Sequence, residues 1–280
     1  MESFDQSLLS ALQDVELISA KPLSGGLSNR CWLLEIRTGS SCQCSSLVWR
    51  PIAASSRAFD VSRHHEYQVL EQIASSKIAP KPAYLLEHGL LVEWIEGEEA
   101  GNELSDTVLL KLQAEIHTLP VPHWRLDVQQ KAAHYWQFIP QHFKTPELIS
   151  IFHYYQDQQL PTKFADTCCH HDLGRYNIIR AADGRNVVID WEYAAAGDPS
   201  LDLALTINAN GLEPNGAVKM YCQHCGISNE QQWLDAVADW QPWCDYLAML
   251  WFFVGAETWQ DQAYLESANP LLQKLILNNH

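Results

Sequence analysis

Residues 168–198 read CCHHDLGRYNIIRAADGRNVVIDWEYAAAGD, and the rest of the chain is understood outward from them. The stretch predicts a β-hairpin, because two short runs rich in β-branched residues, 177–180 and 185–189, flank Asp183-Gly184. Asp and Gly both tolerate positive φ, so this pair is a strong turn signal. A polar loop therefore enters the first strand, and an acidic cluster leaves the second.

The expected hairpin brings Asn177 and Asp190 side by side, with Asp172 on the loop just before it. An amide oxygen and a carboxylate are hard ligands of the kind that Mg²⁺ takes beside substrate phosphates. Asp172 lies where a carboxylate can accept a proton from a hydroxyl group, and its spacing to Asn177 is that of a kinase catalytic loop. The pattern favours phosphoryl transfer, and the alternative is a surface hairpin with a few loop acids.

The motifs HHDLGRYNII (170–179) and VIDWEYA (188–194) resemble those of the aminoglycoside phosphotransferase and choline kinase superfamily of small-molecule kinases. Within it, the chain is similar to bacterial thiamine kinases and bacterial choline kinases. The resemblance implies an α+β, protein-kinase-like fold of two lobes, with ATP and Mg²⁺ between them. The β-rich nucleotide-binding lobe would comprise residues 1–96, and the mainly helical catalytic and substrate-binding lobe residues 97–280.

The same resemblance implies roles for five residues of the central stretch. Asp172 would be the catalytic base, and His170 would brace its loop. Asn177 and Asp190 would be the Mg²⁺ ligands. Glu192 would lie near a second metal ion or the substrate.

A glycine-rich turn, Ser24, Gly25 and Gly26, lies between two expected strands at 15–20 and 31–36. Adjacent glycines let a backbone approach a ligand closely and point N–H groups at phosphates. The residues alone fit a plain hairpin with a glycine bulge equally well. The resemblance places a phosphate-covering loop here.

Arg50 ends an expected strand at 47–50, where the resemblance places a lysine that reaches the ATP phosphates. Arginine keeps the charge but is longer and planar, so this is a departure from the protein-kinase pattern. Glu66, on an expected helix at 62–74, is the natural ion-pair partner of Arg50 unless it faces solvent. By position, the backbone of Glu93, Trp94 and Ile95 would form the hinge that binds adenine.

The C-terminal third is rich in tryptophan. Trp240, Trp243 and Trp251 recur on one face of an expected helix. The stripe fits core packing, and it also fits a cage of rings for a cationic ligand, with Asp245 as counter-charge. We therefore count these four residues, with Glu192, as candidate substrate residues.

Three further polar residues are open to local interpretations. Asp198 or Asp202 is expected either to accept hydrogen bonds from the catalytic loop or to cap the helix that begins near them. His117, on an expected helix at 105–118 with Ser105 as N-cap, is expected to be a packed, hydrogen-bonded structural histidine rather than a base.

The net charge of the 280 residues is −16. Such a surface repels nucleic acid and anionic membranes and suits a cationic small substrate. The N-terminus lacks a basic segment, and the longest apolar run, 246–256, is far below the roughly 20 residues of a membrane span. We expect a cytoplasmic protein with no nucleic-acid or membrane partner, and the oligomeric state stays open.

The sequence therefore predicts an ATP- and Mg²⁺-dependent kinase for the primary hydroxyl of a small cationic alcohol. Thiamine is the first choice, because the segments at 124–127 and 240–252 also resemble thiamine kinases. Choline or ethanolamine is the runner-up, and an aminoglycoside ranks below both. Two other classes remain: a nucleotide-binding protein without catalysis, suggested by Arg50, and a metal-thiol protein built on Cys222 and Cys225.

Overall fold

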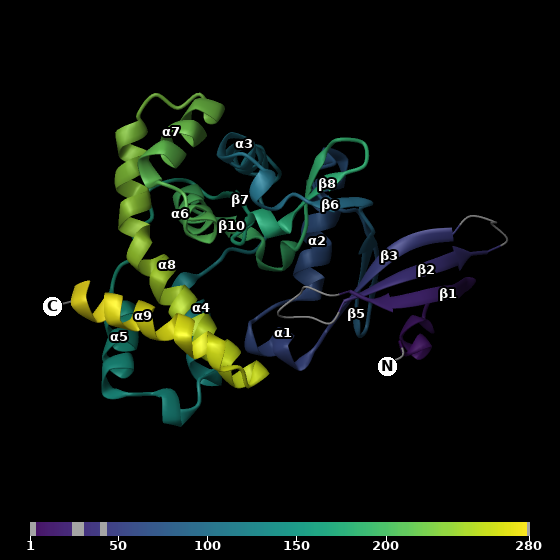
Figure 1. The fold of residues 1–280 in the computed structure, drawn as a ribbon, viewed down its shortest axis with the longest axis horizontal. Helices are drawn as coiled ribbons and strands as arrows, with labels where there is room; N and C mark the ends of the chain where they lie inside the picture. Colours follow the sequence, from purple (N-terminus) through teal and green to yellow (C-terminus); the bar gives the residue numbers. More distant parts are fainter. Residues whose placement is uncertain (1–3, 24–30, 40–43, 279–280) are drawn as a thin grey trace. The chain divides into compact units, whose positions relative to one another are not determined.

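The computed structural model describes residues 4–23, 31–39 and 44–278. The chain forms two compact units, each assembled from segments that are distant in the sequence (Figure 1). The first unit comprises residues 1–57, 61–101 and 176–193, and the second comprises 58–60, 102–175 and 194–280. The expected phosphate loop of Ser24, Gly25 and Gly26 lies outside the described residues. The functional lobe boundary between residues 96 and 97 stays a prediction.

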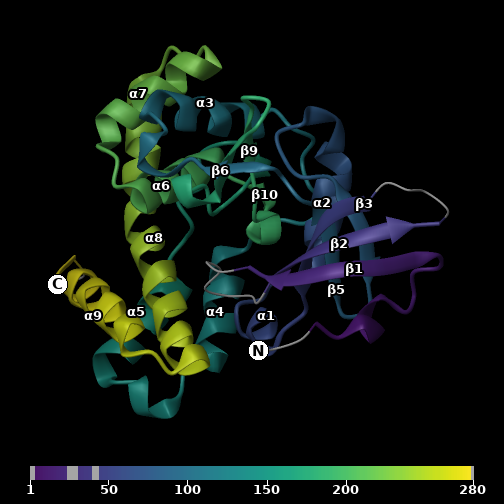
Figure 2. The same cartoon turned by 45° about the vertical axis from the view of Figure 1, so that its right-hand side comes forward.

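The first unit is built on a five-stranded antiparallel sheet in the order β1-β2-β3-β5-β4. Figure 2 shows β1, β2 and β3 of this sheet side by side. Its strands are β1 (Val15–Pro22), β2 (Trp32–Thr38), β3 (Cys44–Pro51), β4 (Pro82–Leu86) and β5 (Gly89–Glu93). Alternate residues of β2 and β3 point to one face, where Leu34, Ile36, Leu47 and Trp49 are buried together with Leu91. The strands expected from the sequence are therefore present.

The predicted hairpin is confirmed as β8 (Ile178–Ala181) paired antiparallel with β9 (Asn186–Val188), and β6 (Gly97–Glu99) extends this second sheet. Gly184 in the turn has φ +85°, the conformation for which the Asp-Gly pair was singled out. Directly after β9, a 3₁₀ turn, η6 (Trp191–Tyr193), follows Asp190. Asp190 and Glu192 therefore lie on a short connection directly after the hairpin.

The short helices of the first unit follow local signals. They are η1 (Gln6–Leu9), α1 (Ala54–Ala58), which ends at the boundary of the unit, α2 (Arg63–Ile73) and η2 (Ala74–Ser76). The Ser62 hydroxyl accepts from His65 N–H and caps α2. Leu8, Leu9 and Leu12 would share one face of a helix, so the sequence predicts a short helix over residues 4–14. That prediction is wrong: only the 3₁₀ turn η1 forms, capped by Asp5, because so short a segment does not offset the cost of helix nucleation.

The second unit is mainly helical. Its helices are α3 (Asp106–Ile116), α4 (Val128–Phe138), α5 (Pro146–Asp157), α6 (Pro199–Asn210), α7 (Pro214–Cys225), α8 (Glu230–Trp259) and α9 (Gln262–Asn278), with the 3₁₀ turn η4 (Gln141–Phe143). Its two short strands are β7 (Thr167–Cys169) and β10 (Ala195–Gly197). Two further 3₁₀ turns, η3 (Gly101–Glu103) and η5 (Arg175–Asn177), lie at the boundaries between the two units of the chain. The long α8 packs against α6 and α9, as both views show. The apolar run 246–256 lies inside α8, and among the described residues no helix meets the length and apolarity needed to cross a bilayer.

A close backbone approach sets the position of the catalytic loop. Strands β7 and β10 pair antiparallel, with Ala195 opposite Cys169, so the start of α6 comes next to the residues that follow β7. A Cβ on Gly197 would lie 2.8 Å from Nε2 of His171, which only glycine avoids. The loop that begins at His170 is therefore packed onto the entry to α6.

Candidate active site

Arg50, near the end of β3, contacts three carboxylates of the first unit. Its Nε lies 2.7 Å from Oε1 of Glu66 on α2, which confirms the expected ion pair. Its Nη2 donates to Asp190 and also, at 3.2 Å, to Oε2 of Glu192. Because the side chains of Arg50 and Glu66 are largely buried, solvent screens this pair poorly. The guanidinium is held in one orientation, and a planar, oriented guanidinium suits phosphate recognition.

A second arginine, Arg63 at the start of α2, completes the charged cluster. Its Nη1 donates to Oε2 of Glu66 and, at 2.9 Å, to Oε2 of Glu192. Its Nε donates to the carbonyl of Pro51 at 3.2 Å, and the side chain is fully buried. The sequence analysis missed Arg63. The available signal was its i, i+3 spacing to Glu66 on the first turn of a capped helix.

The candidate metal ligands lie at the open end of the hairpin, away from its Asp-Gly turn. Ile189 N–H donates to the carbonyl of Asn177 at 2.8 Å, which places Asn177 beside the residue preceding Asp190. Asp190 has φ +65°, a conformation that non-glycine residues rarely adopt and that occurs at functional sites. An amide oxygen and a carboxylate at this point fit Mg²⁺ by the chemistry of the donor atoms. Their role as metal ligands stays a prediction.

Glu192 is buried within the arginine cluster. Burial, and next the charge of Asp190, raises the pKa of Glu192 to about 7, against the opposing effect of Arg63 and Arg50. The carboxylate is thus engaged by two guanidinium groups of the protein itself. Its place near a second metal ion or the substrate stays a prediction.

In the second unit, Asp202 of α6 anchors the start of the catalytic loop. Its Oδ1 accepts from His171 N–H at 2.6 Å, and its Oδ2 accepts from His170 N–H at 3.4 Å. The expected contact of an α6 aspartate with the loop is therefore confirmed for Asp202. Within the loop, Asp172 N–H donates to Nδ1 of His170 at 3.3 Å, so the histidine braces the backbone of the candidate base.

Asp198 plays the other role that was left open. Its Oδ1 accepts from Ser200 N–H at 2.8 Å, which makes it the N-cap of α6. Its Oδ2 accepts from the backbone N–H groups of Lys163 and Phe164. Asp198 is therefore the helix cap, and Asp202 is the residue that accepts hydrogen bonds from the catalytic loop.

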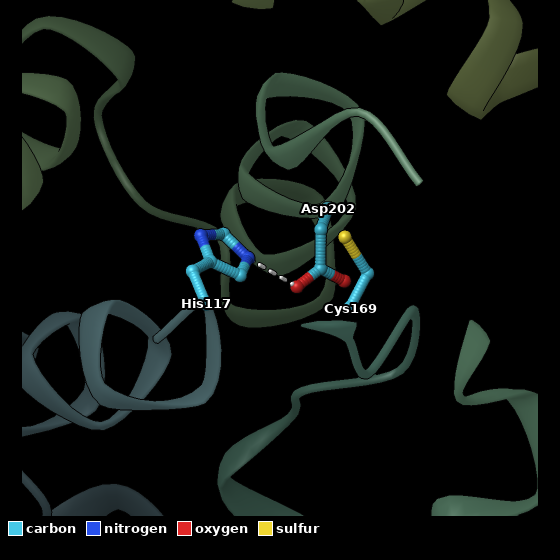
Figure 3. Close-up of side chains that lie close together, drawn as sticks. All are labelled: His117, Cys169 and Asp202. Atoms are coloured by element: carbon cyan, nitrogen blue, oxygen red, sulfur yellow. Dashed lines mark hydrogen bonds and ion pairs between the residues drawn. The ribbon is translucent and has the colours of Figure 1, made fainter. Parts of the chain in front are cut away.

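His117, Cys169 and Asp202 lie close together in Figure 3, with ligand atoms that a metal ion could use. His117 Nε2 lies 2.9 Å from Asp202 Oδ2, and its Nδ1 lies 2.6 Å from the Tyr221 hydroxyl. The Cys169 thiol donates to the carbonyl of Gly197 at 3.3 Å, and burial, with Asp202 nearby, raises its pKa well above the ordinary value. Both ring nitrogens and a protonated thiol are thus in hydrogen bonds. We interpret the group as a structural brace, as expected for His117.

The candidate substrate residues of α8 differ in environment. Trp240 and Trp243 are almost fully buried, and Trp243 packs edge-on against Tyr155 with ring centroids 4.9 Å apart. Asp245 Oδ2 lies 2.6 Å from Nζ of Lys274 on α9. Their part in substrate binding stays a prediction, since these contacts are also those of a helix core.

Trp251 is only half-buried and lies further along α8. Its ring centroid is 5.1 Å from that of Phe59 and 5.7 Å from that of Trp259, both within the second unit. Trp251 is thus the least buried of the four α8 candidates, and its part in substrate binding stays a prediction.

The expected hinge follows β5. Glu93 N–H donates to the carbonyl of Lys81 at 2.8 Å, and Trp94 N–H donates to that of Ser46 at 3.1 Å. These two N–H groups therefore serve the sheet. Adenine binding at the hinge, which stays a prediction, would use Ile95 or the backbone carbonyls.

The sequence profile of the phosphotransferase enzyme family matches residues 19–236. The chain belongs to the phosphotransferase enzyme family. Among relatives of this phosphotransferase, a thiamine kinase of Escherichia coli is 28% identical over 214 residues, covering 76% of this chain and 77% of the relative. A thiamine kinase of Shigella boydii is 28% identical over 213 residues, covering 76% of both chains. The family and these relatives make the chain a small-molecule kinase.

Solved structures confirm the kinase-like α+β fold of this phosphotransferase. The choline kinase LicA from Streptococcus pneumoniae superimposes with a TM-score of 0.73 at 18% identity over 96% of both chains. A complex of LicA with AMP gives a TM-score of 0.74 at the same identity and coverage. The GDP complex of aminoglycoside 2'-phosphotransferase-IIIa gives 0.62 at 15% identity, covering 98% of this chain and 97% of the other.

Proposed function

We propose that this phosphotransferase transfers the γ-phosphoryl group of ATP to the primary hydroxyl of thiamine and forms thiamine monophosphate. The observation that carries the proposal is the similarity to two thiamine kinases over about three quarters of both chains. We also propose that the protein is cytoplasmic and acts on a free small molecule, with no nucleic-acid or membrane partner. Its net charge of −16 favours a cationic substrate.

ATP is the proposed donor, and the charged cluster of the first unit supports this. Arg50 is held by Glu66, as the strand lysine of protein kinases is held by its glutamate partner. Fold neighbours of the chain have been solved with AMP and with GDP. In this proposal the ATP phosphates are contacted by Arg50 and by the loop of Ser24, Gly25 and Gly26. The adenine is contacted by the segment of Glu93, Trp94 and Ile95.

Asn177 and Asp190 would hold Mg²⁺, which when bound neutralises charge on the phosphates. Asp172 is the proposed general base. It accepts the proton of the thiamine hydroxyl as that oxygen forms its bond to the γ-phosphorus, and the bond to the β–γ bridging oxygen breaks to release ADP. His170 and Asp202 hold the backbone of the base in place.

On the acceptor side, thiamine offers a permanently charged thiazolium and a flat pyrimidine. Trp251 provides an aromatic face, and each cation–π contact is worth about 0.5–2 kcal/mol. Glu192, Trp240, Trp243 and Asp245 are the other proposed substrate residues.

Choline is the second candidate substrate, because the fold is that of a choline kinase over nearly the whole chain. It also carries a permanent positive charge and a primary hydroxyl. Ethanolamine ranks with it, and an aminoglycoside ranks third. A protein that binds nucleotide without transferring phosphate is the remaining alternative.

The test is a competition in one tube with thiamine and choline at equal, sub-saturating concentrations, which compares kcat/KM directly. We expect thiamine monophosphate to form faster than phosphocholine, with Mg²⁺-dependent release of ADP. Choline phosphate forming at least as fast would make the thiamine assignment wrong. Nucleotide binding without transfer to any alcohol of a wider panel would overturn the kinase proposal itself.

A further inference from the structure

One face of α6 runs along the catalytic loop. Asp202, Thr206 and Asn210 follow i, i+4 and i+8 and therefore lie in one row on the helix surface. Asp202 holds the N–H groups of the two residues before the candidate base, as described above. Asn210, the last residue of the helix, contacts the part of the same loop that comes after the candidate base.

The amide of Asn210 bridges the loop and the helix. Its Nδ2 donates to the carbonyl of Leu173 at 2.9 Å and to that of Thr206 at 2.8 Å. Its Oδ1 accepts from Arg175 N–H at 2.9 Å and from Arg175 Nη1 at 3.4 Å. Two donors and two acceptor positions are used, which is the full capacity of a carboxamide and also determines its orientation.

The geometry points to Asn210 as a positioning residue for Asp172, an inference that rests on the proposed function. Leu173 and Arg175 are the first and third residues after the base. Gly174 N–H donates to the carbonyl of Asp172 at 3.0 Å and closes a tight turn there. Asp202 and Asn210 thus hold the backbone before and after Asp172 from a single rigid helix.

Only an amide fulfils this role at position 210. A carboxylate would keep the contact to Arg175 but would bring an oxygen against the carbonyls of Leu173 and Thr206. An apolar side chain would leave these backbone groups without their partner, at a cost in free energy. Gly211, with φ +60°, ends the helix directly after Asn210, so the amide stands at the helix end that faces the loop.

The test compares Asn210→Ala and the isosteric Asn210→Asp with a matched control, Asn208→Ala. Asn208 lies on the same helix turn, is exposed, and accepts from Gln241 rather than from the loop. For each variant we would measure kcat, KM for ATP, the stoichiometry of nucleotide binding, and the ratio of phosphorylated alcohol to ADP released.

We expect both Asn210 variants to lose about 10- to 100-fold in kcat, the cost of a base displaced by around 1 Å. KM for ATP and nucleotide stoichiometry should stay near those of wild type, and the product-to-ADP ratio should fall because the hydroxyl is no longer aligned. Asn208→Ala should match wild type in all four measurements.

A purely structural role would behave differently. The apparent kcat would then fall only as far as the fraction of folded enzyme falls, which the nucleotide-binding stoichiometry measures. The ratio of phosphorylated alcohol to ADP would stay at the wild-type value. That result, or a kcat equal to that of Asn208→Ala, overturns the inference while the proposed function stands. If Asn210→Ala fails to fold, the same four measurements on the isosteric Asn210→Asp test the inference. A wild-type enzyme that transfers phosphate to no alcohol overturns both.

Discussion

Arg63 donates to Glu192 across 129 residues of sequence, with Nη1 and Oε2 2.9 Å apart. The same nitrogen donates to Glu66. The contact ties the first turn of α2 to the 3₁₀ turn that follows Asp190. Arg63 therefore neutralises two of the carboxylates that surround Arg50, and the buried cluster is a linked network rather than one ion pair.

Arg63→Met is expected to lower the free energy of unfolding by about 3–5 kcal/mol, because the buried carboxylates of Glu66 and Glu192 lose one of the two guanidinium groups that neutralise them and keep their contacts with Arg50. Equilibrium unfolding in urea measures the change. The control is Arg37→Met, which breaks a pair with Glu16 that is 2.8 Å long but exposed, and should cost at most about 1 kcal/mol. Equal effects of the two substitutions would contradict the network.

Asp172→Ala is expected to lower kcat by roughly 10²–10⁴, the usual contribution of a positioned general base. Nucleotide affinity, measured by calorimetry with ADP, should be nearly unchanged because the side chain acts on the acceptor hydroxyl. A variant that retains wild-type turnover would remove Asp172 from the mechanism.

Asp190→Asn is expected to weaken Mg²⁺ binding and abolish transfer. An amide can still accept from Arg50, but it does not neutralise the charge of the metal as a carboxylate does. Mg²⁺ titration in the presence of ADP, followed by calorimetry, gives a readout that is independent of turnover. Full activity with only a lowered melting temperature would assign Asp190 a structural role.

Asp202 gives a prediction on pH. Burial opposes its ionisation, but the hydrogen bond from His117 and the nearby histidines hold the pKa of Asp202 well below its usual value. Because the folded pKa is depressed, this stabilisation is present above the unfolded pKa, near 3.8, and is lost as pH falls through the folded pKa.

Asp202→Asn should therefore lower stability by about 1.5–3 kcal/mol at pH 7, the value of a hydrogen bond to a charged group. The difference from wild type should narrow as the pH falls below about 4. Denaturant unfolding between pH 7 and pH 3 checks this, with the exposed Asp239 changed to Asn as control. A difference that does not depend on pH would show that charge is not what stabilises this site.

Trp251→Leu is expected to raise KM for thiamine by about 2- to 30-fold, which corresponds to one cation–π contact of about 0.5–2 kcal/mol. KM for ATP should not change, since the ring is assigned to the acceptor side. A lowered melting temperature with an unaltered KM for thiamine would place Trp251 in the core alone.

The features that could be predicted from the sequence are those whose hydrogen bonds close within a few residues. The 178–188 hairpin with its Asp-Gly turn and the Ser105 and Asp198 caps are of this kind. The expected helix at 4–14 failed for the opposite reason, because nothing local could stabilise more than a 3₁₀ turn. The tryptophans of α8 were placed on the right helix, but the pattern did not tell how far each would be buried.

The sequence by itself determined the kinase-like α+β fold, the family, and the residues Asp172, Asn177 and Asp190 as candidates for catalysis and metal binding. Only the tertiary structure decided that Arg63 joins the cluster around Arg50 and that Asn210 forms hydrogen bonds with the catalytic loop. The physical reason is sequence separation. Arg63 meets Glu192 across 129 residues and Asn210 meets Leu173 across 37, and such contacts form only once helices and strands have packed and brought their buried polar groups within hydrogen-bonding distance.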